Sequence, residues 1–152
     1  MSGDVKMFIR NKKAWHEYFI EDSYEAGIVL EGNEVKSIRA GSANIKDAYV
    51  RIKDGEAFIH NMHISPYEKA SSWAVAPLRV RKLLLHKKEI IKLLSFVMQK
   101  GFTLVPLSVY LKKGRVKIEI GAARGKKLYD KREEIARRDA DRNREIARKM
   151  AR

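Results

Sequence analysis

The chain has 152 residues, 45% of them hydrophobic, which suffices for one domain with a core and is too short for two full domains. Lys and Arg number 33 against 19 Asp and Glu, and the net charge of +14 predicts a polyanionic partner. The absence of cysteine excludes disulfides and thiolate metal sites. No apolar run reaches the roughly 18 residues of a membrane span, so we expect a soluble, cytoplasmic protein without membrane contact.

Apolar residues alternate with polar ones along the first half of the chain, as in half-buried strands. The first alternating segment is Tyr24–Leu30, where Gly27 predicts a bulge or sharp bend. Two further segments, Ala48–Lys53 and Glu56–Ile64, flank the pair Asp54-Gly55. Because Asp-Gly readily adopts the positive φ angles of a tight turn, these two segments are expected to form a β-hairpin.

A second hairpin is expected in the C-terminal half. Phe102–Leu111 and Arg115–Ala123 alternate in the same way around a Lys112–Gly114 turn. Proline has no backbone donor, so Pro106 should lie at an edge or a bulge. The side chains expected to face inward are those of Val116, Ile118 and Ile120.

Two helices are expected between the strands. The shorter is Glu34–Gly41, ended by its glycine, and the longer is Lys82–Lys100, with an apolar face that should pack on the core and a stop at Gly101. Tyr67–Pro77 has the composition of a loop and contains Trp73. Short antiparallel strands with a glycine bend and a packed helix predict an oligonucleotide-binding-type antiparallel β-barrel with about two to three helices.

The sequence lacks a recognisable catalytic constellation. The segment Gly121–Lys126 is one residue short of a phosphate-binding loop, and Lys127 replaces the Ser or Thr that would hold magnesium. His60 and His63 are separated by an odd number of positions, which directs them to opposite faces of a strand, so no metal site is expected. No serine occupies a nucleophile elbow, and no cofactor is predicted.

Basic residues form two clusters. From Lys112 to Arg132 there are nine Lys or Arg and two acidic residues, and from Arg79 to Lys92 there are six basic residues against Glu89. Either cluster taken alone is compatible with an ordinary solvated face. Together they favour single-stranded nucleic acid or RNA as the partner, with neighbouring aromatic side chains as stacking platforms. The aromatic candidates are Trp73, Tyr110 and Tyr129, and the basic candidates on the second cluster are Arg79, Arg81 and Lys82.

Four segments carry a specific resemblance to a known family. They are NKKAWHEYFIEDSYEAGIVLEGNEVKSIRAG, NMHISPY, RVRKLLLHKKEI and ARGKKLYDKRE, and in this order and spacing they resemble the small protein B family of tmRNA-binding proteins, from about Asn11 onward. The resemblance implies a non-catalytic adaptor of bacterial trans-translation. Such an adaptor delivers tmRNA, as one monomer per tmRNA, to ribosomes stalled without a stop codon, so that the nascent chain is tagged and the ribosome released.

The resemblance also implies RNA contacts for Glu25 in YEAG and for Leu84 and His86 in KLLLHK. A carboxylate can accept hydrogen bonds from base amino groups or sugar hydroxyls, or hold a neighbouring cation in position. The simpler interpretations are a solvent-facing strand residue for Glu25, helix core for Leu84 and an exposed histidine for His86. One departure concerns the position before Pro77, where the family usually carries an acidic residue and this chain has Ala76; this puts the local hydrogen bonding of the loop in question.

The C-terminal segment differs in composition from the rest of the chain. We expect a tmRNA-binding barrel domain over residues 1–123 and a basic tail over residues 124–152, which holds twelve basic and six acidic residues. With so few large apolar side chains the tail should be disordered alone and should fold on the ribosome. The resemblance implies that it enters the empty mRNA channel of the small subunit, with Tyr129 near the decoding centre. The functional start of the tail would comprise Gly125, Lys126, Lys127, Asp130, Lys131 and Arg132.

Two alternatives remain open from the sequence. A generic ribosome-associated or single-strand-binding barrel would bind RNAs with little discrimination. An RNA-modifying enzyme or nuclease would need a catalytic carboxylate or histidine group, which the residue pattern does not supply.

Overall fold

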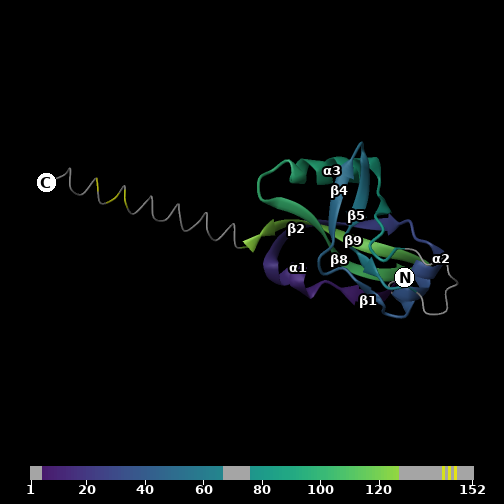
Figure 1. Ribbon diagram of the computed structural model, residues 1–152. Helices are drawn as coiled ribbons and strands as arrows, with labels where there is room; N and C mark the ends of the chain where they lie inside the picture. Colours follow the sequence, from purple (N-terminus) through teal and green to yellow (C-terminus); the bar gives the residue numbers. More distant parts are fainter. Residues whose placement is uncertain (1–4, 67–75, 127–141, 143, 145, 147–152) are drawn as a thin grey trace.

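A closed antiparallel β-barrel organises the computed structural model, which describes residues 5–66 and 76–126 together with residues 142, 144 and 146 (Figure 1). Three helices accompany the strands in these ranges. In chain order the elements are β1 (Val5–Arg10), α1 (Lys12–Glu17), β2 (Tyr18–Ile28), α2 (Gly32–Arg39), β3 (Ala43–Asn44), β4 (Tyr49–Lys53), β5 (Glu56–His60), β6 (His63–Ile64), β7 (Arg81–Leu84), α3 (Lys87–Val97), β8 (Phe102–Lys112) and β9 (Arg115–Gly125). The expected fold class, an oligonucleotide-binding-type barrel with about two to three helices, is confirmed for this part of the chain.

The barrel closes through its two longest hairpin strands. The main sheet has the order β1-β8-β4-β5-β7-β2-β9, and β8 also pairs with β9, which joins the ends of the sheet. On its other edge β8 pairs first with β4, at Val50↔Leu104, and then with β1, from Ser108 to Lys112. Closure leaves few strand edges unpaired, so the curved outer surface is available for binding partners. In Figure 1, α3 lies across the top of the barrel near β4 and β5.

Both predicted hairpins are confirmed. Asp54 and Gly55 have φ angles of 53° and 76°, and Lys113 and Gly114 have 50° and 76°. Two consecutive positive φ angles match the right-handed twist of the flanking strands, which explains why these turns could be read from the sequence. The predicted irregularity at Pro106 is also present, as a register shift between Pro106 and Ser108 in the pairing of β8 with β9.

The role predicted for Gly27 is wrong in one respect. The register shift of β2 lies between Ile20 and Asp22, and β2 begins at Tyr18, well before the predicted strand. Gly27 instead pairs with Leu84 on β7 and with Lys117 on β9. A Cβ atom at Gly27 would lie 3.2 Å from Cβ of Leu84, so a side chain at this position would require Leu84 to move by a few tenths of an ångström.

The long predicted helix is also corrected. Its first residues form β7, and α3 begins only at Lys87. The alternation of buried and exposed residues in β7 has period two, and its pairing with β5 and β2 fixes it as a strand. Most of the apolar face that was expected to pack on the core is exposed to solvent. Leu93 is fully buried, whereas Ile91 is 58% exposed and Met98 is 80% exposed. The shorter helix, α2, agrees with the prediction within two residues, and Gly41 follows it with a φ of 77°.

The strand predicted over Glu56–Ile64 is interrupted. Asn61 has a φ of 60°, which ends β5 at His60 and starts β6 at His63. The two histidines therefore lie on different strands, and the ring of His60 stacks on Tyr49 with centroids 5.2 Å apart. The predicted loop of residues 67–77, with Trp73, lies almost entirely outside the described residues.

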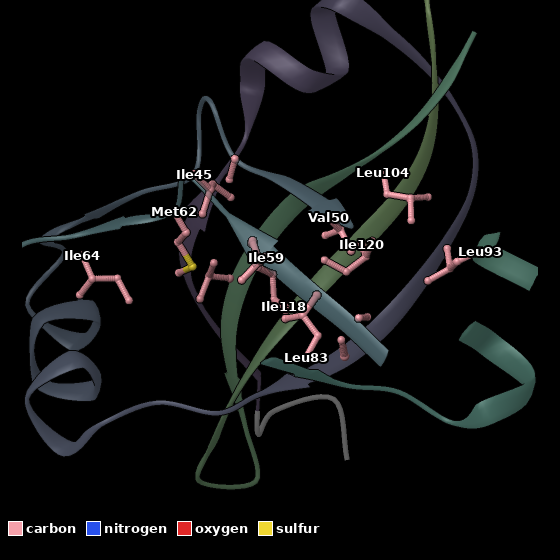
Figure 2. Packing of buried hydrophobic residues seen from close by; sticks show 14 of the residues in the cluster. Ile45, Val50, Ile59, Met62, Ile64, Leu83, Leu93, Leu104, Ile118 and Ile120 are labelled. Atoms are coloured by element: carbon pink, nitrogen blue, oxygen red, sulfur yellow. The ribbon is translucent and has the colours of Figure 1, made fainter. Parts of the chain in front are cut away.

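The core fills the interior of the barrel, with contributions from both hairpins and from α2 and α3. Figure 2 shows Ile45, Met62 and Ile64 grouped at one end of the cluster and Leu93 at the other. The inward orientation predicted for β9 is confirmed, since Ile118 and Ile120 are fully buried and Val116 packs against the same cluster. Within residues 5–66 and 76–126, no helix is long and apolar enough to cross a membrane.

Strand β9 passes the expected boundary between barrel and tail. It continues to Gly125, with Phe19↔Arg124 and Tyr18↔Gly125 as its last pairs with β2. The division at residues 123 and 124 stays a prediction, because most of the tail lies outside the described residues.

Candidate nucleic-acid interface

An open groove of about 840 Å³ lies on the outer surface of the barrel, between β2, β7 and the start of α3. We call it the Leu84 groove. It brings together four of the residues singled out in the sequence, Glu25 from β2, Lys82 and Leu84 from β7, and His86 at the N-cap of α3. The remaining lining residues are Gly27, Asp54, Gly55, Glu56, Leu83, Leu85, Lys87, Glu89, Ile90 and Lys117.

Leu84 supplies an apolar surface in this groove. Its neighbour Leu83 is 1% exposed in the core, and the period-two geometry of β7 then turns Leu84 outward, where it is 53% exposed. Helix core, the simpler interpretation of Leu84, is therefore wrong. An exposed leucine beside the backbone of Gly27 offers a flat contact for a nucleobase or sugar.

His86 lies at the junction of β7 and α3. It is the N-cap residue of α3, its backbone N–H donates to Glu89 Oε1 at 3.0 Å, and its ring is exposed. The N-terminal end of a helix carries partial positive charge, and Lys87 adds a full one. Phosphate oxygens entering this end of the groove would meet both.

Glu25 on β2 is held in place from β8, the strand on the other side of β9. The hydroxyl of Tyr110 donates to Glu25 Oε2 at 2.5 Å, and Lys112 Nζ lies 3.3 Å from the same oxygen. The hydrogen bond from Tyr110 is the main cause that lowers the pKa of Glu25 below its ordinary value, and Lys112 acts in the same direction. Burial, followed by the hydrogen bond to Glu25, raises the pKa of Tyr110. Glu25 is thus an ionised acceptor of fixed orientation at the edge of the Leu84 groove.

Replacing Tyr110 with Phe should raise the pKa of Glu25 toward 4.5, its ordinary value, while Lys112 still stabilises the carboxylate. The side-chain carboxyl signal of Glu25, followed by NMR from about pH 3 to about pH 7, measures this change. Tyr24→Phe is the matched control, because the hydroxyl of Tyr24 donates to Asp22 instead, at 2.6 Å. An unchanged pKa of Glu25 in Tyr110→Phe would show that the hydrogen bond has no such role.

Arg81, predicted to contact RNA, is fully buried and bound inside the protein, so direct contact is ruled out in this structure. Its Nε donates to Glu34 Oε2 at 2.5 Å, and its two terminal nitrogens donate to the carbonyls of Met62 and Pro77 at 2.6 and 3.1 Å. Glu34 is itself 3% exposed. Arg81 therefore ties α2, the residue before β6 and the segment before β7 together beneath the surface.

Arg79 shares the same carboxylate. Its Nη2 lies 2.5 Å from Glu34 Oε1, which also accepts from the backbone N–H of Glu31 at 2.8 Å. Burial alone would raise the pKa of Glu34, but the hydrogen bonds from Arg79, Glu31 and Arg81 outweigh it and hold the pKa low. The side chain of Arg79 keeps 30% exposure, so part of it reaches the surface. The backbone turns just before Arg79, where the carbonyl of Ala76 accepts a hydrogen bond from the N–H of Arg79 at 3.1 Å.

The charges along the Leu84 groove are mixed. Lys82, Lys87 and Lys117 line it together with the acidic residues Glu25, Asp54, Glu56 and Glu89. Lys82 Nζ lies 3.3 Å from Glu56 Oε1, and both side chains are about half exposed. A surface that attracts phosphate uniformly would carry mostly positive charges. This groove is better suited to hydrogen bonds at defined positions with an RNA of particular shape.

The root of the tail contacts the barrel beside α1. Lys126 Nζ lies 3.4 Å from the carbonyl oxygen of Trp15 and 5.3 Å from the ring centroid of Phe19. Gly125 is held in the pairing of β9 with β2. The other predicted tail residues, Lys127, Tyr129, Asp130, Lys131 and Arg132, lie outside the described residues.

Of the aromatic platforms expected from the sequence, Tyr110 does not fit. It is 8% exposed and its hydroxyl is engaged by Glu25, so it positions a carboxylate and offers no open ring face. Trp73 and Tyr129 lie outside the described residues. Trp15, which was not among the predicted aromatic platforms, is 50% exposed on α1. Its exposure follows from Ala14 being the buried residue of this short helix.

Comparison with known proteins gives a consistent result. The family described as "SmpB protein" matches residues 8–152. The SsrA-binding protein of Acetivibrio thermocellus is 60% identical over 147 residues, which cover 97% of this chain and 94% of that protein. The SsrA-binding protein of Caldicellulosiruptor bescii is 56% identical over 147 residues, covering 97% and 92%.

A solved structure agrees with these sequence matches. A chain from the structure described as "tmRNA-SmpB: a journey to the center of the bacterial ribosome" aligns with a TM-score of 0.67 and 50% identity, covering 78% of this chain and 83% of that chain. Sequence and fold thus lead to one assignment: this chain belongs to the SmpB family.

Proposed function

We propose that this protein binds tmRNA and carries it to ribosomes stalled without a stop codon, as an RNA-binding adaptor of trans-translation and not as an enzyme. The observation that supports this most is the Leu84 groove, where one surface gathers Glu25, Lys82, Leu84 and His86. Its relatives are SsrA-binding proteins, and a structural neighbour comes from the structure described as tmRNA-SmpB at the center of the bacterial ribosome. Such work takes place in the cytoplasm, with one monomer per tmRNA.

Each groove residue has a distinct task in this proposal. Leu84 packs against a base or sugar, and His86 stacks on a base or donates to a phosphate at the start of α3. Glu25, ionised and oriented by Tyr110, accepts from base amino groups or from 2′-hydroxyls. Lys82 pairs with phosphate. Arg81 and Arg79 contribute indirectly, because their contacts to Glu34 position β7 and the segment that precedes it.

The second half of the proposal concerns the tail. We propose that residues 124–152 fold on the ribosome inside the empty mRNA channel, with Tyr129 near the decoding centre. Gly125, Lys126, Lys127, Asp130, Lys131 and Arg132 form the functional start of this segment. The contacts of Gly125 and Lys126 with β2 and α1 support a fixed starting direction for it.

Recovery of bound RNA tests the function directly. The tagged full-length protein is purified from a bacterial lysate and its RNA is sequenced. One dominant tmRNA is the expected result. A broad RNA spectrum would favour the generic barrel instead, and newly processed RNA ends would favour an enzyme.

Glu25→Arg tests the groove. Although it adds positive charge, this substitution should weaken tmRNA binding about tenfold to hundredfold, because hydrogen bonds to a charged group contribute roughly 1.5 to 3 kcal/mol. Filter binding at two salt concentrations measures the effect and separates it from bulk electrostatics. Glu17→Arg, with the same charge change on α1 away from the groove, is the matched control and should bind at least as tightly as the wild type. Unchanged or tighter binding by Glu25→Arg would remove Glu25 from the interface.

A further inference from the structure

A second hollow, of about 430 Å³, lies between β1 and α1 on the outer surface. We call it the Trp15 hollow. Its lining residues are Met7, Arg10, Lys12, Trp15, Leu107, Ser108 and Glu119. None of these residues belongs to the Leu84 groove, and none is among the site residues predicted from the sequence.

The two sites are nevertheless neighbours across β9. Glu119 in the Trp15 hollow is the register partner of Glu25 in the Leu84 groove. Lys117, two residues before Glu119 on the same face of β9, lines the groove. The carboxylate of Glu25 reaches from β2 to the Tyr110 hydroxyl on β8, so its hydrogen bond spans the strand that separates the sites. The outer faces of β2, β9 and β8 therefore join groove and hollow into one surface.

The side chains of the hollow combine apolar and basic groups. Trp15 is 50% exposed and Met7 is 46% exposed. Neither belongs to the apolar cluster beneath α1, which contains Ala14, Val105 and Leu107. Arg10 and Lys12 are exposed on either side of the turn into α1. None of the ion pairs within residues 5–66 and 76–126 involves Arg10 or Lys12. An accessible indole beside two cations has the chemistry of a base-stacking and phosphate-binding site.

We propose that the Trp15 hollow binds one unpaired nucleotide of the tmRNA held in the Leu84 groove. The base stacks on Trp15 and contacts Met7, and the adjoining phosphate pairs with Arg10 and Lys12. The volume lies within the range of about 300 to 1,000 Å³ typical of small-ligand sites. RNA is favoured over a protein partner because the hollow carries two cations and one carboxylate, Glu119, and because it continues a groove assigned to RNA. The inference rests on the proposed function.

Tryptophan fluorescence offers a readout specific to this site. The chain has two tryptophans, so Trp73→Phe leaves Trp15 as its only indole. Titration of this full-length variant with tmRNA should quench Trp15 emission, with the same midpoint as binding followed by gel shift. Wild-type-like binding combined with unchanged emission would overturn the proposal.

Substitutions give the second test. Trp15→Ala should weaken tmRNA binding about fivefold to hundredfold, the range that base stacking on an aromatic ring gives on alanine substitution, whereas Trp15→Phe should keep most of the affinity. Changing Arg10 and Lys12 together to Gln should reduce the salt slope of binding, since each lost phosphate contact with a single strand removes about 0.7 from it. Ser23→Ala, on an exposed position of β2 outside both sites, is the control.

The outcomes separate this inference from the function on which it rests. If Glu25→Arg loses tmRNA and Trp15→Ala binds like the wild type, the proposed function stands and the Trp15 hollow is not a tmRNA site. Emission that changes only on addition of stalled ribosomes would likewise overturn the inference, by assigning the hollow to a ribosomal partner. If both variants bind tmRNA normally, neither Glu25 nor Trp15 is part of the interface and the inference fails, whereas the proposed function fails only if the wild-type protein does not recover tmRNA.

Discussion

Arg81→Met should destabilise the fold by about 3 to 5 kcal/mol, the usual cost of removing one partner from a buried ion pair. It would leave Glu34 buried with Arg79 as its remaining cation, remove the Arg81 donor from the carbonyl of Met62, and leave the carbonyl of Pro77 with the N–H of Ile64 as its donor. This is a large part of the total stability of about 5 to 15 kcal/mol expected for a domain of this size. Urea unfolding followed by circular dichroism measures the loss.

Two further variants make this result interpretable. Lys82→Met, one residue along β7, breaks a half-exposed pair with Glu56 and should cost less than about 1 kcal/mol. The double variant Arg81→Met with Glu34→Leu should recover part of the loss, because it no longer leaves a carboxylate without its full set of donors. A cost below about 1 kcal/mol for Arg81→Met alone would mean that the buried network is not a determinant of stability.

Truncation after Lys126 should leave tmRNA binding nearly intact and abolish peptide tagging. The cut keeps β9 complete, including the last pairs with β2, so the barrel should remain folded. The residues removed, 127–152, carry ten basic and six acidic side chains, so only a salt-screened attraction is lost, with a Debye length of about 8 Å at physiological ionic strength. Tagging should fail because no segment remains to occupy the vacant mRNA channel. Gel shift with tmRNA, paired with tagging on ribosomes stalled without a stop codon, measures both effects.

A variant with three point substitutions tests the tail without removing the whole segment. Asp130→Ala, Lys131→Ala and Arg132→Ala together remove two basic groups and one acidic group, and Arg152→Ala gives the same net change of charge at the end of the tail. Only the triple variant should lose tagging. Normal tagging by the truncated protein would contradict the assigned role of the tail, and loss of tmRNA affinity by orders of magnitude would place the tail within the primary binding site.

The turns of this barrel were predictable because their causes are local. Both turns have two consecutive positive φ angles with glycine in second place, at Asp54-Gly55 and Lys113-Gly114, and the alternation on either side then sets the strands. Helix α1 also has a local signal that was missed, since the Asn11 side chain accepts from the N–H of Ala14 as an N-cap.

Other features have causes that no short window of sequence contains. Arg81–Leu84 reads as the start of a helix because its leucines run on into the apolar pattern of α3, and only pairing with β2 and β5 makes it a strand. The ion pair of Glu34 with Arg81 joins positions 47 residues apart. For the same reason the residue pattern alone assigned Leu84 to a helix core, and the family resemblance was needed to associate it with Glu25 and His86.

Strand β9 has a consequence for the spacing of the whole assembly. It carries Lys117 of the Leu84 groove, Glu119 of the Trp15 hollow and, at its end, Gly125 at the root of the tail. Paired with β2 and β8 on its two edges, it cannot stretch or shorten, and at about 3.4 Å per residue it separates Lys117 from Gly125 by about 27 Å. The strand therefore fixes the distance between the surface that would hold RNA and Gly125 at the root of the tail. An insertion of two residues would lengthen it by about 7 Å, and an insertion of one would turn every later side chain to the opposite face. A change in the length of the tail would leave the separation between Lys117 and Gly125 unchanged, whereas a change in the length of β9 would alter it.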